Sequence, residues 1–283
     1  MIFMSLRPRM PKTGIGCTGF RQRQYGISNM TGSHRPAVKK YNTGFTLVEM
    51  AMVLMIVGLL LGGMLVPLSA QMEQRNVTET RKQIDEIQQA LIGYAVINGR
   101  LPCPASSTSN GVESPTTGTG ICDHNYDGYV PAATLGLSGT DSSGFAVDSW
   151  GNRIRYAVTA WSSNTYTVPN GMSTKGISNL TPPDLLVCST ATSIGTSSCA
   201  SGTSLTSNGV PVVIFSTGKN GAQSSAGIDE AANLDGTNAN NNRTFVSHTP
   251  TPSGATNGEF DDIVIWISPN VLINRMVAAG KLP

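Results

Sequence analysis

The longest apolar stretch of this chain runs from Met50 to Met72, and none of its 23 residues carries a charge. A helix needs ~20 apolar residues to cross a bilayer, so the stretch is long enough to span a membrane. After Val77 apolar residues recur at helical spacing up to Asn98, and Gly99 follows as a natural stop. The pattern therefore predicts one long helix that is apolar all round in its first half and amphipathic in its second.

The second half of that helix should bury one face against a globular domain. Apolar residues at helical spacing define this face, namely Val77, Ile84, Ile87, Leu91 and Tyr94. The opposite face carries two opposite-charge pairs spaced by four residues, which is typical of a solvated surface. These pairs are Arg81 with Asp85 and Lys82 with Glu86.

Beyond the helix the apolar runs are short and bounded by turn residues, which predicts strands. The runs lie within 165–168, 185–188, 210–217 and 261–267. Residues 222–258 are polar and low in complexity, which predicts a long loop. A short helix should follow the N-cap Ser268, with Pro269 at its first position and Gly280 at its end.

Charge is distributed unevenly along the chain. The first 44 residues hold 8 of the 19 basic side chains and no acidic one, so the other 239 carry 11 basic and 17 acidic side chains, a net charge of −6. Basic residues before an apolar span keep that side of it cytoplasmic. An acidic body, in a chain with only 13% charged residues, is a poor binder of nucleic acid, and we predict no such partner.

Four cysteines follow the long helix, and a fifth, Cys17, precedes it. No two of them have the Cys-x-x-Cys spacing of zinc sites, whereas an even number in an exported chain is typical of disulfides. Four cysteines allow three pairings. We favour the sequential pairing, because each bond then closes a short loop: Cys103 with Cys122 and Cys188 with Cys199.

A short signature stands directly before the apolar stretch: Gly44-Phe45-Thr46-Leu47-Val48-Glu49. With the basic leader before it, this signature resembles the type IV pilins and the pseudopilins of type II secretion. In that family a membrane-embedded prepilin peptidase cuts after the Gly and methylates the new amine. The resemblance implies cleavage between Gly44 and Phe45 and N-methylation of Phe45. Glu49 would then pair with the charged amine of a neighbouring subunit during assembly.

Glu49 also has a local interpretation. Thr46 and Glu49 have the spacing of a capping box, in which Glu49 accepts a hydrogen bond from the amide of the N-cap Thr46. The two roles are compatible. A lone carboxylate in hydrocarbon costs several kcal/mol. The helix dipole offsets only ~0.3–1 kcal/mol of that cost, which favours a counter-charge on another chain.

Other interpretations of the apolar stretch stay open. An ordinary secretory signal cut after Ala70 fits poorly, because Leu68 occupies a position that should be small and the stretch exceeds the usual ~7–15 residues. The stretch could also be the uncleaved single-pass anchor of a periplasmic binding module. Pro67 and the glycines near it are compatible with local unwinding in a filament and with a plain kink of a membrane helix.

The resemblance implies an α+β fold. A long N-terminal helix, membrane-spanning in its first half, would pack its amphipathic half on an antiparallel β-sheet domain with long loops and a short C-terminal helix. The expected divisions are a leader that is removed (1–44), a membrane and filament-core segment (45–72), an amphipathic helix half (73–99) and a periplasmic or extracellular domain (100–283).

Localisation and partners follow from the same resemblance. Before assembly the chain would cross the bacterial inner membrane once, with its N-terminus in the cytoplasm. After assembly it would belong to a periplasmic or extracellular filament. Its partners would be prepilin peptidase, copies of itself and other pilins.

One loop resembles the first half of a calcium-binding loop. Asp123, Asn125 and Asp127 place oxygen ligands at alternate positions before Gly128. Thr134 stands where the bidentate Glu would be. An Asx/Gly turn beside a disulfide explains the same residues. Calcium is therefore an optional ligand of this loop, and no cofactor is required.

Three further motifs predict structure. The block from Asp148 to Gly151 resembles the stretch that opens the sheet in many pseudopilin-like domains, where the Trp packs under the sheet and the Asp and Gly shape a turn. The turn at Gly218 lacks the first Gly and the Ser or Thr that a phosphate loop needs. Asp261 and Asp262 should point to opposite faces of a strand, so we expect a strand-entry turn or part of a cation site rather than a dyad.

The sequence shows no nucleophile paired with a base, and its three histidines stand apart. We therefore predict a non-enzymatic filament subunit, a pilin or minor pilin. A type II secretion pseudopilin is the nearest alternative, because the N-terminal signature is common to both.

Overall fold

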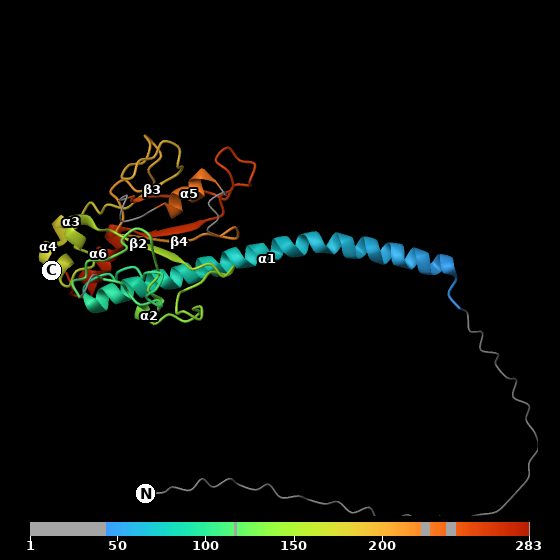
Figure 1. The fold of residues 1–283 in the computed structure, drawn as a ribbon, viewed down its shortest axis with the longest axis horizontal. Coiled ribbons are helices and arrows are strands. Elements are labelled where there is room, and N and C mark those ends of the chain that lie inside the picture. The colour runs from blue at the N-terminus through green and yellow to red at the C-terminus, as the bar shows by residue number, and fades with distance from the viewer. Residues whose placement is uncertain (1–43, 116–117, 222–226, 236–241, 283) are drawn as a thin grey trace, which may run out of the picture. The chain divides into compact units, whose positions relative to one another are not determined.

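The chain combines helices and two small sheets in the computed structural model, which describes residues 44–115, 118–221, 227–235 and 242–282, with the backbone alone for 63–68 (Figure 1). The predicted leader lies outside the described residues except for Gly44. The helices are α1 (Leu47–Asn98), α2 (Ala132–Leu135), α3 (Trp161–Asn164), α4 (Gly171–Lys175), the 3-10 helix η1 (Ile177–Asn179), α5 (Ile228–Leu234) and α6 (Pro269–Ala278). The strands are β1 (Gly128–Tyr129), β2 (Arg155–Val158), β3 (Leu186–Cys188), β4 (Val212–Ser216), β5 (Thr244–Val246) and β6 (Ile263–Ile267).

Helix α1 begins with the predicted capping box. The amide of Thr46 donates to Glu49 Oε2 at 2.9 Å, and the amide of Glu49 donates to Thr46 Oγ1 at 3.2 Å. The helix continues to Asn98. Gly99 ends it with a φ of 70°, a left-handed conformation that glycine adopts without strain. The predicted bounds of the helix are confirmed to within two residues.

Packing divides the chain into two compact units, and the boundary falls within α1 after Ile56. In the first unit the large apolar side chains that the structure describes are exposed, with Phe45, just before α1, at 79% and Leu47, its first residue, at 88%. Among the residues that the structure describes, no helix combines the length and the apolarity that a membrane crossing requires.

The larger sheet lies in the second unit and has four antiparallel strands in the order β1-β2-β4-β6. Strand β4 is buried along its whole length and pairs on both sides, with Ile214 opposite Tyr156 of β2 and opposite Ile265 of β6. An unbroken apolar run suits such a strand, because both of its faces are covered. A second sheet pairs β3 with β5 in parallel.

Apolar clusters cover both faces of the larger sheet. The first joins Ile84, Ile87 and Leu91 of α1 to the sheet residues Tyr156 and Ile214, and it also receives α6. The second joins the opposite face of β4 to the smaller sheet. The predicted buried face of α1 is therefore confirmed, and so is the α+β fold with an antiparallel sheet and a C-terminal helix (Figure 1).

The C-terminal helix α6 has Pro269 at its start, as predicted, although the Ser268 side chain forms no capping hydrogen bond. On the solvated face of α1, Lys82 and Glu86 form an ion pair at 3.9 Å. Arg81 and Asp85, the other predicted pair, are exposed and form no ion pair within the described structure.

Residues 165–168 form no strand, contrary to the prediction. They follow α3, and tertiary contacts draw their side chains inward. The Tyr166 hydroxyl donates to the carbonyl oxygen of Leu180, and the Thr167 hydroxyl donates to the carbonyl oxygen of Gly120. The apolar character of this segment reflects that packing rather than strand pairing.

Residues 222–258 are not one loop, because their described parts contain α5 and β5. Asn233 of α5 explains how so polar a segment is ordered. Its side-chain amide donates to the carbonyl oxygen of Val246 at 3.1 Å and accepts from the amide of Val246 at 2.7 Å. A side chain thus pairs with the backbone of β5 as a neighbouring strand would.

Candidate functional site

The N-terminal signature forms the first turn of α1. Besides the capping bonds, Glu49 Oε2 accepts a hydrogen bond from the Thr46 hydroxyl at 3.0 Å. Within the described residues the carboxylate has no basic partner. The large apolar side chains that follow up to Leu61 are exposed. The segment therefore places an acidic capping residue at the start of a helix whose apolar side chains are exposed.

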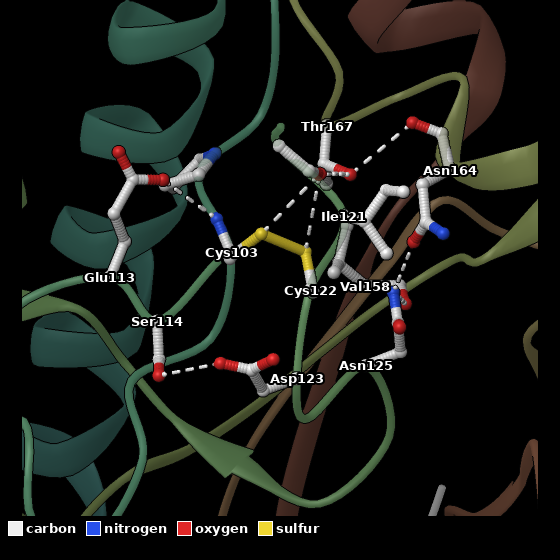
Figure 2. Close-up of a disulfide and its surroundings, with 12 residues drawn as sticks. Cys103, Glu113, Ser114, Ile121, Cys122, Asp123, Asn125, Val158, Asn164 and Thr167 are labelled. Atoms are coloured by element: carbon white, nitrogen blue, oxygen red, sulfur yellow. Dashed lines mark hydrogen bonds between the residues drawn. A yellow bond between two sulfur atoms is a disulfide. The ribbon is translucent and has the colours of Figure 1, made fainter. Parts of the chain in front are cut away.

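The first disulfide joins Cys103 to Cys122, as predicted, and it is buried against the core between α1 and the sheet (Figure 2). It fixes the loop that leaves the end of α1. Thr167 Oγ1 and the sulfur of Cys103 both lie near the carbonyl oxygen of Gly120, at 2.7 and 3.6 Å. This part of the domain is therefore held by a covalent bond and by buried polar contacts.

Glu113 joins the same loop to the end of α1. Its carboxylate accepts two hydrogen bonds from Arg100, at 2.7 and 2.9 Å, and one from the amide of Cys103 at 3.0 Å. The Tyr94 hydroxyl donates to it at 3.1 Å. Burial alone would raise the pKa of Glu113, but the bonds from Arg100 and Cys103 outweigh it and hold the pKa below its usual value. We assign Glu113 a structural role.

The second disulfide joins Cys188 to Cys199, again as predicted. It closes a surface loop beside β3, and this loop is tied to α5 through Asp229. The buried carboxylate of Asp229 accepts from the amide of Ala191 and lies 3.3 Å from His248 Nε2. The disulfide therefore stabilises a region to which the loop beside β3, helix α5 and the segment around His248 all contribute.

The three predicted calcium ligands contact different partners. Asp123 accepts a hydrogen bond from Ser114 at 3.3 Å, and Asp127 lies 3.3 Å from His124. Asn125 is buried, and its amide donates to Asn164 Oδ1 at 2.9 Å and to the carbonyl oxygen of Val158 at 3.4 Å. Figure 2 shows Asp123 and Asn125 directed toward these separate partners. These contacts favour the turn beside a disulfide, and calcium on this loop stays a prediction.

A different group of acidic side chains converges at the end of the larger sheet. Among the described residues, Glu230, Asp261 and Asp262 form the group whose carboxylate oxygens, one from each, lie within 4.8 Å of one another. Glu230 and Asp262 are buried, at 3% and 6% exposure. The prediction that Asp261 and Asp262 face opposite ways is wrong, because β6 begins only at Ile263 and strand alternation does not reach them.

Three buried oxygens at this end of the sheet have no hydrogen-bond partner in the described structure: Asp261 Oδ1, Asn220 Oδ1 and Thr217 Oγ1. Asn220 contacts the group directly, since its side-chain amide donates to Glu230 at 2.8 Å and its backbone amide to Asp261 at 3.2 Å. Thr217 is 3% exposed and directly follows Ser216, which pairs with Ile263 at the start of β6. Oxygen ligands of this kind suit a hard cation such as Ca²⁺.

Electrostatics also favours a cation at this group. Burial raises the pKa of Asp261 to about 6; hydrogen bonds from backbone amides oppose the rise, and the charge of Glu230 adds to it. Burial also raises the pKa of Asp262 well above its usual range. Within the described structure no basic side chain forms an ion pair with the three carboxyl groups. Protons or a bound cation would therefore relieve their repulsion.

Sequence reasoning missed Glu230, because the polar composition of its segment predicted a loop. A signal was present, since Asp229 and Glu230 precede Ala, Ala and Leu as acidic residues of a first helical turn often do.

The block at Asp148 is structural, as predicted. Asp148 Oδ1 accepts from the amides of Trp150 and Asn152, and Oδ2 accepts from the Ser216 hydroxyl at 2.6 Å.

Comparison with known proteins addresses the N-terminal segment. Residues 39–65 match the family described as the prokaryotic N-terminal methylation motif. The chain is also similar to the type II secretion system core protein G of Pseudomonas aeruginosa, with 27% identity over 118 residues that cover 42% of this chain and 75% of the relative. No solved structure matches the chain significantly. The chain therefore carries a prokaryotic N-terminal methylation motif, at the residues where its sequence resembles the type IV pilins and the pseudopilins of type II secretion.

Proposed function

We propose that this chain is a structural, non-enzymatic subunit of a type IV pilus-like filament, a pilin or minor pilin. The observation that carries the proposal is the methylation motif at 39–65, together with the exposure of the large apolar side chains that α1 carries from Leu47 to Leu61. Burying one large apolar side chain gains ~1.5–3 kcal/mol. Such a surface is therefore stable where lipid or other subunits cover it.

The apolar segment would serve two environments in turn. Before assembly it would hold the chain in the bacterial inner membrane, since Met50 to Met72 carries no charge and eight basic residues precede Gly44. After extraction, the same segments of many copies would pack together in the filament core. The domain from residue 100 onward would then lie outside, in the periplasm or beyond the cell.

Processing provides the direct experiment. Prepilin peptidase would cut after Gly44 and methylate Phe45, so the intact mass of the mature protein should correspond to residues 45–283 with one added methyl group. A mature protein that begins after Ala70 would support a secretory signal instead. A chain that keeps its leader would support a membrane-anchored binding module. Either result would contradict the proposal.

A type II secretion pseudopilin is the second candidate, and the similarity to core protein G favours it. The methylation motif is compatible with both functions. Neighbouring genes separate them, because a pilus subunit should be encoded beside pilus assembly components and a pseudopilin beside secretion components. A deletion strain extends this comparison: loss of surface filaments indicates the pilus, and loss of exoprotein release indicates secretion.

We also propose that a calcium ion, where present, binds at Glu230, Asp261 and Asp262 rather than at the Asp123 loop. The convergence of three carboxylates supports this choice. Buried oxygens without a hydrogen-bond partner occur at both places, since Asp127 Oδ1 of the other loop also has none in the described structure. The ion would neutralise the acidic group and join α5 to the start of β6. Its role would be to stabilise the domain.

Thermal unfolding with calcium and with a chelator tests this placement. Calcium should raise the melting temperature of the wild-type protein, since an ion that binds only the folded state stabilises it by mass action. The increase should disappear in Glu230→Gln and persist in the matched variant Asp123→Asn. The reverse pattern would place the ion at the Asp123 loop. An unchanged melting temperature in the wild type would exclude both sites.

A further inference from the structure

The free edge of β6 borders an open groove. Strand β6 pairs with β4 on one side. On its other side a groove of about 740 Å³ is lined by Ile263, Val264 and Ile265 of the strand and by α1 residues from Glu73 to Asp85. Farther along, Gln88 of α1 donates a hydrogen bond to the carbonyl oxygen of Trp266 at 3.2 Å. The groove therefore opens between the helix and the strand and closes where Gln88 contacts β6.

The hydrogen bond from Gln88 shows which backbone groups of β6 face the groove. The carbonyl of Trp266 points toward α1, and groups two residues apart along a strand point the same way. The N–H and C=O of Val264 therefore face the groove. An edge strand with such groups is a template for another extended segment. All five residues of β6 are apolar, and Val77 of α1 provides an apolar wall opposite them.

The charge of the groove indicates the chemistry of its occupant. Its lining carries the carboxyl groups of Glu73, Asp85, Asp261 and Asp262 against one guanidinium group, that of Arg81, besides His248. Asp85 and Arg81 form no ion pair with each other. Glu73 and Asp85 lie outside the acidic group of Glu230, Asp261 and Asp262, so their two carboxylates still outnumber the guanidinium of Arg81 where protons or a cation neutralise that group.

We infer that this groove binds an extended basic segment of another polypeptide, which adds to β6 as a fifth strand of the larger sheet. Backbone pairing with Val264 would supply affinity, and basic side chains facing Asp85 and Glu73 would supply selectivity. The inference does not depend on the filament proposal, since every lining residue belongs to the second compact unit.

A pair of synthetic peptides tests the charge preference. The probes are blocked heptapeptides that alternate valine with lysine or valine with glutamate, so that one face of each strand is apolar. Binding to the full-length chain in detergent is followed by tryptophan fluorescence, because Trp150 lines the groove. The lysine peptide should bind at or below about 1 mM, the weak end of specific recognition, and the glutamate peptide should not. Equal binding of the two peptides, or no binding of the lysine peptide, would overturn the inference.

Two variants locate the binding at this edge. Val264→Pro removes an N–H that faces the groove, a change that an edge strand tolerates, and it should weaken the lysine peptide at least about tenfold. Asp85→Lys should weaken the lysine peptide and favour the glutamate peptide. Glu79→Lys, the same charge change on an exposed residue of α1 outside the groove lining, should change neither.

Folding and self-association are checked on the same samples. Thermal unfolding shows whether Val264→Pro is folded; if it is not, Asp85→Lys and Glu79→Lys decide the question alone. Unchanged binding in the folded Val264→Pro or in Asp85→Lys would refute strand addition at β6. A second copy would be the occupant instead if sedimentation showed self-association that Val264→Pro abolishes while the wild type binds neither peptide.

Discussion

Glu49 is the residue on which assembly would depend. In the structure its carboxylate serves as the capping acceptor of α1, through bonds to the amide and the hydroxyl of Thr46. A glutamine oxygen can accept the same bonds, so the cap does not require a charge. A pair with the amine of Phe45 from another copy does require it, which lets a single substitution separate the two roles.

Glu49→Gln should therefore leave the helix, the membrane insertion and the cleavage unchanged and abolish assembly. Filament yield by electron microscopy measures the effect, and the intact mass shows that processing continues. Glu79→Gln, farther along the same helix and exposed, is the matched control and should assemble normally. Normal filaments from Glu49→Gln would refute the charge pair and leave Glu49 as a capping residue.

At the scale of elements, the carboxylate of Glu113 joins the end of α1 to the disulfide-bonded loop that follows it. Glu113 bonds Arg100, the amide of Cys103 and Tyr94, all in the last turns of α1 or the segment after it. Burial, with the charge of Glu113 added, raises the pKa of Tyr94 to about 12, so this hydroxyl remains a donor at neutral pH. The network couples the helix to the disulfide-bonded loop.

Glu113→Gln should destabilise the protein at pH 7 by about 1.5–3 kcal/mol, the usual contribution of hydrogen bonds to a charged group. The pKa of Glu113 is lower in the folded state than in the unfolded state. Its contribution is therefore full above the unfolded pKa of ~4.3 and is lost as the pH falls through the lower folded value.

Denaturant unfolding, followed by circular dichroism with the disulfides intact, measures this difference. The gap between wild type and Glu113→Gln should be wide at pH 7 and narrow near pH 3. Glu86→Gln, on the exposed face of α1, should show little change at either pH. A gap that is independent of pH would mean that packing, and not the charge, explains the role of Glu113.

At the scale of the whole molecule, the apolar segment at the start of α1 and the core of the folded domain are built from different residues. Both large core clusters consist of residues from Val77 onward, so the described residues before it contribute nothing to them. The acidic body, with a net charge of −6 after the leader, also favours solubility once the apolar segment is covered or absent.

A fragment of residues 73–283 should therefore fold and remain monomeric without detergent, whereas residues 45–283 should require detergent or assemble. Sedimentation measures the oligomeric state, and circular dichroism with thermal unfolding measures the fold. Aggregation or loss of cooperative unfolding in the fragment would show that the segment before residue 73 is part of the domain's stability.

Several features could be predicted because their signals are local or covalent. The helix from Leu47 to Asn98, its capping box and its buried face follow from periodicity and from residues three or four apart. Strands β4 and β6 and helix α6 follow from apolar runs with clear boundaries. The two disulfides follow from short sequence separations of 19 and 11.

The sequence by itself determined the methylation signature, the long helix and the cysteine pairing, because each depends on neighbours along the chain. Only the tertiary structure decided where acidic side chains meet. Glu230 reaches Asp261 and Asp262 because α5 packs beside the end of β6, across some thirty residues of chain. The groove beside β6 likewise exists because α1 and the sheet edge, far apart in sequence, lie side by side and contact each other through Gln88 beyond the end of the groove. Long-range packing of this kind leaves no periodic mark in the order of residues.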